Sequence, residues 1–310
     1  MNKYERFSAA VTGGAVDRPP VTAWVHFQSD HLSGAKTAEL HANFLRAYDW
    51  DVLKVMNDYR YPVPEGVTTL TDASSLAAYR RLDMAEPSFT RQLDCLKRLQ
   101  DADLRTPMLE TVFEPFQQIV RNIGFGQGSN LLKHRKAALQ ALEVVTETVC
   151  EYVATVKAMG VEGIFISVNG AMPETLPRGV TAEDHDILQK PFTKAVLEAA
   201  AGMVRVLHVH GNRLDMTRVL DYPCEVLSVS DRLADNPSLA TLRGMTDKCL
   251  MGGLDETRLP ERTLPELAAE VDDAVRQAGR SRCIVAPGCT IPSFTPQRVL
   301  SYLGAYVGQL

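Results

Sequence analysis

The sequence lacks the features that would tie it to a membrane or to secretion. Its 310 residues contain no stretch approaching ~18 uninterrupted apolar residues, the length a helix needs to cross a bilayer. The first ten residues carry three charged side chains and no apolar segment, unlike a secretory signal. We therefore expect a cytoplasmic protein that does not contact a membrane.

Positive charge is scarce as well. The 33 Lys and Arg residues are outnumbered by 38 Asp and Glu residues, so the formal net charge is −5. No basic run interleaved with aromatic residues is present, and nucleic acids are bound by basic patches of that kind. The sequence argues against nucleic acid as a partner and leaves a small molecule as the expected substrate.

Two further motifs are missing. No Gly-x-Gly-x-x-Gly turn follows an early strand, which argues against an open dinucleotide-binding sheet. Residues 124–128 (GFGQG) lack that spacing and are predicted to form a flexible loop. Cys-x-x-Cys pairs are also absent, so we expect free thiols in a cytoplasmic chain. The six cysteines are Cys95, Cys150, Cys224, Cys249, Cys283 and Cys289.

What the chain does have is a repeated β-then-α pattern. Eight short runs rich in Val, Ile and Leu suit strands that are buried on both faces. Stretches with helical periodicity lie between most of them, as at 137–159 and 264–278. Eight such units predict an α/β fold, a single (β/α)8 TIM barrel that forms one domain over residues 1–310. The predicted strands are 21–27, 51–56, 105–113, 161–168, 203–210, 224–230, 248–254 and 283–287.

Polar side chains terminate nearly every predicted strand. In barrels of this type, catalytic groups come from the C-terminal ends of strands and from the loops that follow. The candidate catalytic residues are Asp58, His208 and Asp231, and the candidate substrate-binding residues among these polar groups are His26, Glu114, Asn169 and Asp255. Two aromatic residues, Trp24 and Tyr59, complete the substrate-binding set as apolar lining of the pocket.

The segment VLHVHGN carries the most specific pattern. Strand side chains alternate between faces, so His208 and His210 point to the same side. Cys289, in VAPGCTIP after the eighth predicted strand, supplies a third donor for a zinc site that keeps a position open for substrate. The spacing equally allows a site without metal, in which one histidine bonds to the backbone and the other transfers protons.

Three carboxylates have alternative roles. Asp58, in VMNDYRYP, fits a general acid or a substrate anchor, or else a cap on the next turn. Asp231 and Asp255 could orient the imidazoles or hold a polar substrate. Each could equally pair with a neighbouring arginine, Arg232 or Arg258, at the surface.

Nine segments occur in a characteristic order: RPPVTAWVHF, DVLKVMNDYRYP, ETVFEPFQQI, GVEGIFISVNG, KPFTKAVLEAA, LHVHGN, SDRLADNPSLA, LMGGLDE and IVAPGCTIPSFTPQRVL. Their order and spacing resemble the uroporphyrinogen decarboxylase superfamily over nearly the whole chain. That superfamily includes the porphyrinogen decarboxylase itself and zinc-dependent, corrinoid-linked methyltransferases.

The decarboxylase branch differs from this chain after the first predicted strand. Its arginine-bearing segment of the type RQAGRY is replaced here by WVHFQSDHLSG. A substrate with eight carboxylates needs several compensating cations, and Arg18 with Arg60 is a small supply. The resemblance therefore favours the methyltransferase branch over a true porphyrinogen decarboxylase.

The methyltransferase branch is similar at its zinc motif, a His-x-Cys on the fifth strand and a Gly-Cys element at the eighth. Gly288 and Cys289 match the second element, whereas His210 replaces the first cysteine. The resemblance implies a zinc ion that activates a substrate thiol and a methylated corrinoid protein as methyl donor. Imidazole in place of thiolate leaves the site one charge more positive, which argues against thiol alkylation and points to demethylation of a methoxy or similar substrate.

Three functions stay open at this stage. The first is a zinc-dependent methyl or alkyl transferase or demethylase, with a corrinoid protein as methyl partner. The second is a metal-free decarboxylase or lyase in which Asp58 and His208 handle protons, and the third is a barrel that binds a ligand without turnover. A homodimer is the expected assembly, because twofold symmetry is the commonest arrangement.

Overall fold

A computed structural model describes residues 1–69, 72–123, 128–176 and 178–310 of the chain. Residues 124–127 of the predicted GFGQG loop lie outside the described residues, and residue 128 begins a helix.

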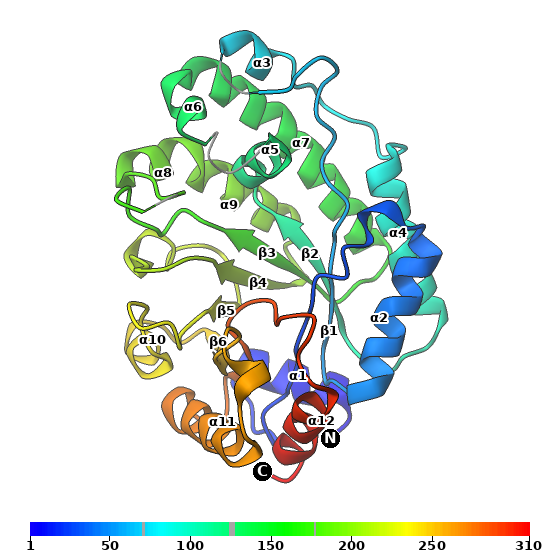
Figure 1. Cartoon of the computed structure of the whole chain (residues 1–310). Helices are drawn as coiled ribbons and strands as arrows, with labels where there is room; N and C mark the ends of the chain where they lie inside the picture. The colour runs from blue at the N-terminus through cyan, green and yellow to red at the C-terminus, as the bar shows by residue number, and fades with distance from the viewer. Residues whose placement is uncertain (70–71, 124–127, 177) are drawn as a thin grey trace.

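The centre of the fold is a curled sheet of parallel strands, each followed by a crossover that returns along the outside (Figure 1). Neighbours in the sheet follow the order of the chain, from β1 to β7. Right-handed β-α-β crossovers produce this sequential order. The strands are β1 (Leu53–Val55), β2 (Met108–Phe113), β3 (Gly163–Val168), β4 (Val204–Val209), β5 (Val226–Val229), β6 (Cys249–Leu254) and β7 (Cys283–Pro287).

These seven strands lie within seven of the eight predicted runs, and the predicted strand at 21–27 is corrected. In that segment only Val21 forms a bridge, parallel to Val285. Its carbonyl also accepts a hydrogen bond from the Asp51 amide. The Thr22 amide still donates to the Val285 carbonyl, but the ladder ends beyond it because the Trp24 carbonyl accepts from the amide of Ile291, which lies outside β7. The segment therefore runs alongside β7 and the residues just before β1 without forming a strand.

Helices cover the outer face of the sheet (Figure 1). The predicted helices at 137–159 and 264–278 are confirmed as α7 and α11. Helix α11 begins with a capping box, in which Thr263 and Glu266 satisfy each other's backbone amides. The α-helices are α1 (Lys3–Thr12), α2 (Gly34–Tyr48), α3 (Ala73–Ala77), α4 (Pro87–Asp101), α5 (Pro115–Ile123), α6 (Gly128–Lys133), α7 (Arg135–Ala158), α8 (Ala182–Leu188), α9 (Lys190–Ala199), α10 (Leu239–Met245), α11 (Leu264–Ala278) and α12 (Gln297–Val307).

Two apolar clusters hold these layers together. The larger cluster lies between the sheet and the surrounding helices. The smaller one fills the inside of the curl, where alternate side chains of the strands meet. Phe7 and Val11 of α1 belong to this inner cluster, as do Trp24 and Phe165. The inner cluster therefore has α1 at one end and, at the other, aromatic rings that line a cavity.

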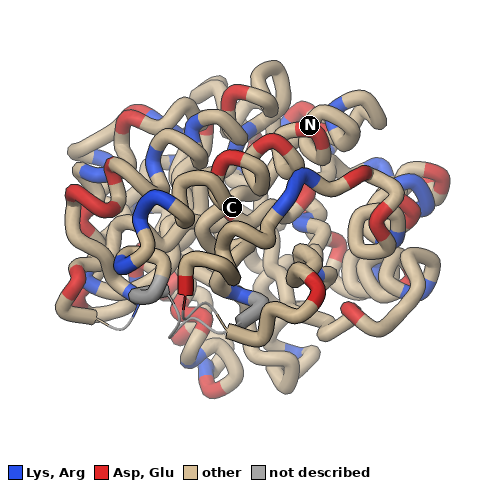
Figure 2. The backbone as a smooth tube through the Cα atoms, turned by 90° about the horizontal axis from the view of Figure 1, so that it is seen from above, with Lys and Arg blue, Asp and Glu red and all other residues tan. Residues whose placement is uncertain are grey.

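Acidic and basic residues are interspersed over the outside of the molecule (Figure 2). None of the helices in the described ranges is long and apolar enough to cross a lipid bilayer. The six cysteines are free thiols, as predicted.

A buried carboxylate joins the N-terminal segment to the sheet. Asp51 is fully buried before β1 and accepts hydrogen bonds from Arg6 at 2.8 Å and from Arg18 at 2.5 Å. It also accepts the backbone amide of Val21 at 2.9 Å. The same residues thus fix both α1 and the segment that leads to the cavity.

We expect Asp51→Asn to destabilise the protein by about 3 kcal/mol, because it leaves two arginines without their buried counter-charge. Denaturant unfolding measures this change. The matched control is Asp49→Asn, because Asp49 bonds to Lys3 while its side chain is 89% exposed. The control should lose less than about 1 kcal/mol. Equal losses in the two variants would contradict this role of Asp51.

Candidate functional site

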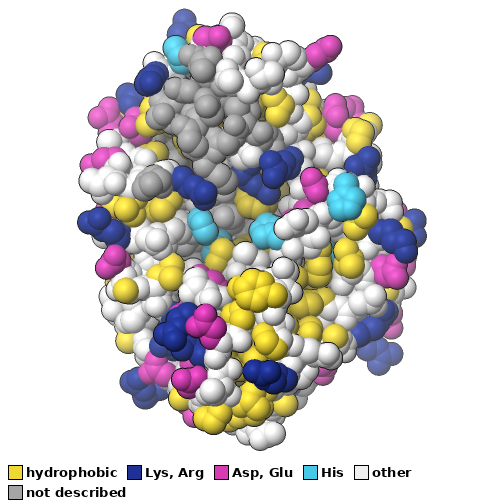
Figure 3. Space-filling model, in the orientation of Figure 1, with side chains coloured by type: hydrophobic (Ala, Val, Ile, Leu, Met, Phe, Trp, Pro, Cys, Tyr) yellow, Lys and Arg dark blue, Asp and Glu magenta, His cyan; other side chains and the backbone are white. Residues whose placement is uncertain are grey.

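A cavity of about 620 Å³ opens at the C-terminal ends of the strands. Figure 3 shows histidine side chains gathered in a hollow near the middle of one face, with Lys and Arg side chains beside them. The residues that line the cavity come from β1 to β4, from α5, from the segment 24–30 that precedes α2, and from the loops after several strands. This is the end of a parallel α/β fold at which ligands bind.

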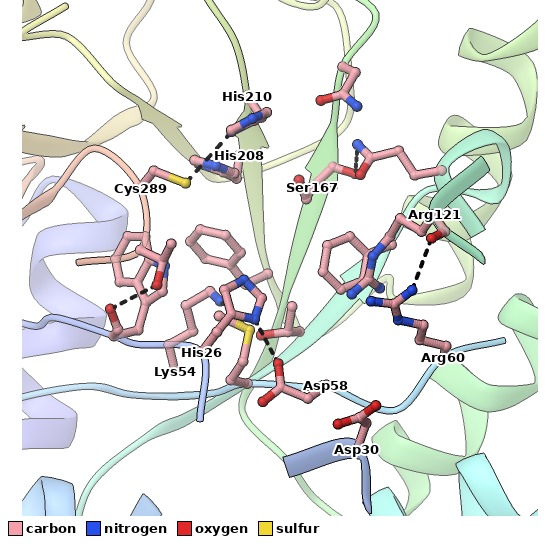
Figure 4. Close-up of a pocket in the computed structure, with 18 of the residues that line it drawn as sticks. His26, Asp30, Lys54, Asp58, Arg60, Arg121, Ser167, His208, His210 and Cys289 are labelled. Atoms are coloured by element: carbon pink, nitrogen blue, oxygen red, sulfur yellow. Dashed lines mark hydrogen bonds and ion pairs between the residues drawn. The ribbon is translucent and has the colours of Figure 1, made fainter. Parts of the chain in front are cut away.

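Three potential metal ligands meet on one side of this cavity (Figure 4). His208 is the penultimate residue of β4, His210 directly follows the strand, and Cys289 lies in the loop after β7. One donor atom from each residue lies within 4.8 Å of the others. The Cys289 Sγ and His210 Nδ1 are 3.6 Å apart. The structure therefore brings together the three residues that the sequence predicted as metal ligands.

His208 is held by contacts on two sides. Its Nδ1 lies 3.2 Å from the Ser228 hydroxyl of β5, and its ring stacks on Phe165 at 5.1 Å between centroids. Burial, together with His210 and Lys54, lowers the pKa of His208 well below its usual value. The neutral imidazole, which has a free nitrogen lone pair, is the form that binds metals.

A glycine allows the loop of Cys289 to approach the neighbouring strand. A Cβ atom on Gly288 would lie 2.3 Å from the Cα of Ser230 and 2.8 Å from a carboxylate oxygen of Glu256. The Gly288 amide donates to the Leu254 carbonyl at the end of β6. Burial raises the pKa of the Cys289 thiol to about 11, so a bound cation would be needed to favour its thiolate.

The donor set suits zinc. Two imidazoles and one thiol are ligand types that zinc prefers, and three protein ligands leave a position for substrate. The Ser228 hydroxyl contacts Nδ1 of His208 and leaves the other ring nitrogen available to a metal, which is the usual arrangement around metal-bound histidines.

A second pair of groups lies beside the metal set. Asp58 accepts a hydrogen bond from Nδ1 of His26 at 2.6 Å and two more from the amide and hydroxyl of Ser29. Burial raises the pKa of Asp58, but the hydrogen bonds from His26 and Ser29 outweigh it and lower that pKa to about 2. Asp58 is therefore a carboxylate that orients His26, whose ring also lines the cavity.

Sequence reasoning missed a lysine in the cavity. Lys54, in the middle of β1, is 4% exposed and places its amine 4.4 Å from the Phe165 ring centroid and 5.1 Å from that of Trp24. Burial lowers the pKa of this amine to about 7. The sequence feature that could have pointed to Lys54 is its position as a single lysine inside the apolar run VLKVM of a predicted strand.

Sequence reasoning also overlooked arginines in the cavity wall. Arg121 of α5 places its guanidinium carbon 3.4 Å from the Phe113 ring centroid. Arg60, which the sequence analysis considered only as a counter-charge, donates to the backbone carbonyl of Arg121. Arg178 lines the cavity as well. No sequence pattern marks Arg121, because its position depends on how α5 packs over the sheet.

Four predicted site residues do not line this cavity. The Tyr59 hydroxyl bonds to Thr37 and to the Leu32 carbonyl. Asp231 accepts the Gly253 amide and lies 3.5 Å from Arg232, and Asp255 accepts from Thr257 and from the Arg258 amide. Glu114 accepts the Asn169 amide and the Thr193 hydroxyl, and burial raises its pKa to about 7. The residues outside the cavity are Tyr59, Glu114, Asp231 and Asp255, whereas Trp24, His26, Asp58, Asn169, His208, His210 and Cys289 line it.

Comparison with known families agrees with the fold. The profile described as uroporphyrinogen decarboxylase (URO-D) matches residues 55–309. The chain therefore belongs to the uroporphyrinogen decarboxylase family. A sequence comparison with curated proteins gives no match.

Several solved structures share this architecture. A methyltransferase from Methanosarcina mazei superposes with a TM-score of 0.83 and 18% identity, covering 100% of this chain and 99% of that one. A B12-independent methionine synthase from Shewanella sp. W3-18-1, in complex with selenomethionine, gives 0.61, 13% identity and 96% coverage of both chains. A putative vitamin-B12 independent methionine synthase from Listeria monocytogenes gives 0.62 and 10% identity, covering 94% of this chain and 96% of that one. At these identities the likeness concerns the fold.

We expect Gly288→Ala to reduce zinc binding, because the added methyl group has to push the Cys289 loop away from Ser230. Zinc content and circular dichroism of the purified variant measure the effect. Gly244→Ala is the matched control, because Gly244 lies in α10 and a Cβ there meets nothing within 4 Å. Unchanged zinc content in Gly288→Ala would contradict the role given to this close approach.

Proposed function

We propose that the protein is a zinc-dependent methyl or alkyl transferase, or a demethylase, that acts on a small molecule with a corrinoid protein as methyl partner. The observation that carries this proposal is the grouping of two imidazoles and a thiol on one wall of the cavity. Family membership and the likeness to a solved methyltransferase agree with it.

His208, His210 and Cys289 would hold the metal. Bound there, a zinc ion would lower the pKa of a substrate thiol or hydroxyl and stabilise the corresponding anion. Two imidazoles with one thiolate supply less negative charge than a set with two thiolates. This favours reactions in which the substrate heteroatom leaves as an anion, such as the removal of a methyl group from a methoxy compound.

His26 is the group best placed to exchange a proton with the substrate. Its Nδ1 is engaged by Asp58, so the proton moves at Nε2. Asp58 acts through His26, because the carboxylate fixes the orientation of the imidazole ring.

The remaining walls of the cavity position the substrate and limit access of water. Trp24 and Phe165 are almost completely buried beside the metal set and pack edge to face at 5.2 Å. Asn169 and Ser167 present polar groups at the end of β3.

Four features expected from the sequence stay predictions. They are the completion of an eight-stranded barrel by the segment at Val21, a single domain, a homodimer and a cytoplasmic location.

The proposal is tested by metal content. We expect about one zinc per chain in protein purified without a metal-affinity tag, and near none in His208→Ala and Cys289→Ala. Elemental analysis measures this directly. Each substitution removes one of three ligands, and two ligands rarely hold zinc at equilibrium.

Two variants serve as controls. Cys150→Ala removes a half-buried thiol of α7, and His31→Ala removes an exposed imidazole, both outside the metal set. Both should retain the zinc of the unmodified protein. Metal-free protein that decarboxylates a substrate in the presence of a chelator would replace this proposal with the lyase alternative.

A further inference from the structure

The cavity is cationic although the chain as a whole is acidic. The formal net charge of the protein is −5, yet basic side chains outnumber acidic ones around the cavity. One of the two acids, Asp58, already engages His26 and Ser29. The charged lining residues are Lys54, Arg60, Arg121, Arg178, Asp30 and Asp58.

Three of these cations have no acidic partner among the described residues. Arg60 donates to a backbone carbonyl, Arg121 lies over an aromatic ring, and the amine of Lys54 contacts a thioether and two rings. Lys54 is buried and Arg121 is partly buried, whereas Arg60 is exposed at the rim of the cavity. Buried basic groups in proteins are ordinarily paired, so the absence of a carboxylate contact matters most for Lys54 and Arg121.

Two partly buried arginines elsewhere in the chain have carboxylate partners. Arg205 pairs with Glu225, and Arg232 pairs with Asp273. In the cavity, by contrast, Lys54, Arg60 and Arg121 make no direct contact with a carboxylate of the described residues.

Arg60 and Arg121 are also close to each other. The Arg60 Nη1 lies 3.2 Å from the backbone carbonyl of Arg121. Burial, together with Arg60, lowers the pKa of Arg121 to about 10, so this guanidinium is still protonated at neutral pH. Two neighbouring guanidinium groups repel each other, and an oxyanion between them would remove that cost.

The arginines lie across the cavity from the proposed metal ligands. Figure 4 shows Arg60 and Arg121 on one side and His208, His210 and Cys289 on the other. The separation follows from the fold: Arg60 comes after β1 and Arg121 lies on α5 after β2, whereas the metal ligands come from β4 and from the loop after β7. One small molecule could contact both ends.

We infer that Arg60 and Arg121 bind an oxyanion of the substrate, a carboxylate or a phosphate, while the methyl-bearing end of the same molecule faces His208, His210 and Cys289. This deepens the proposed function by naming the substrate class, and it rests on that function for the orientation of the molecule. Arginine suits this task because its planar fork donates two parallel hydrogen bonds to one oxyanion.

The test compares three probes of matched shape in zinc-free protein by calorimetric titration. They are 4-methoxybenzoate and 4-methoxyphenyl phosphate, which are charged, and 4-methoxybenzamide, which is neutral. We expect at least one charged probe to bind about tenfold more tightly than the amide, the difference that one charge-assisted interaction gives. The charged probe that binds more tightly identifies the oxyanion.

Variants locate the site. Arg121→Gln should remove most of the preference for the charged probe, and Arg60→Gln should reduce it. Arg298→Gln, an exposed arginine of α12, should leave it unchanged. Circular dichroism and thermal unfolding check that each variant folds, and Arg60→Gln preserves the test if Arg121→Gln does not fold.

Equal binding of all three probes to the unmodified protein would overturn the inference. A charge preference that persists in full in both arginine variants would do the same. Because these titrations use zinc-free protein, their outcome does not depend on whether zinc binds. A failure of the metal-content test would therefore overturn the proposed function while leaving the oxyanion site standing.

Discussion

The close approach of the Cys289 loop to the end of β5 is the constraint on which the site depends. At Gly288 the backbone comes so near Ser230 that no larger residue fits without movement. That approach puts a thiol next to two imidazoles whose common direction is set by strand alternation in β4. The inner cluster contributes Phe165, whose ring stacks on the imidazole of His208 and holds it in place. Three distant parts of the chain thus meet at one wall of the cavity.

The fold was largely predictable because its signal is local. Strands buried on both faces read as apolar runs, and seven of the predicted runs contain the observed strands. The segment after Pro20 has the same composition, but the structure makes it a bridge rather than a strand. That difference arises from the Trp24 carbonyl, which bonds to the amide of Ile291 outside β7. A single sequence contains no record of such long-range hydrogen bonds.

The pair of histidines in the site was predictable because their spacing matches the two-residue period of a strand. His208 lies in β4 and His210 directly follows its last residue, so the two-residue alternation of an extended chain predicted their common face. The role of Arg121 could not be foreseen, because it depends on how α5 packs over the strand ends. Asp231 and Asp255 also follow strands, yet each turns toward neighbouring backbone amides instead of the cavity. A polar residue at a strand end is therefore a candidate whose direction only the tertiary structure decides.

A zinc site made of two imidazoles and one thiolate at the wall of this cavity can be recognised by X-ray absorption spectroscopy at the zinc edge of zinc-loaded protein. We expect one sulfur ligand at about 2.3 Å and two imidazole nitrogens at about 2.0 to 2.1 Å, with the sulfur signal absent in Cys289→Ser. Zinc surrounded only by oxygen and nitrogen in the unmodified protein would show that Cys289 is not a ligand and that the proposed site is wrong.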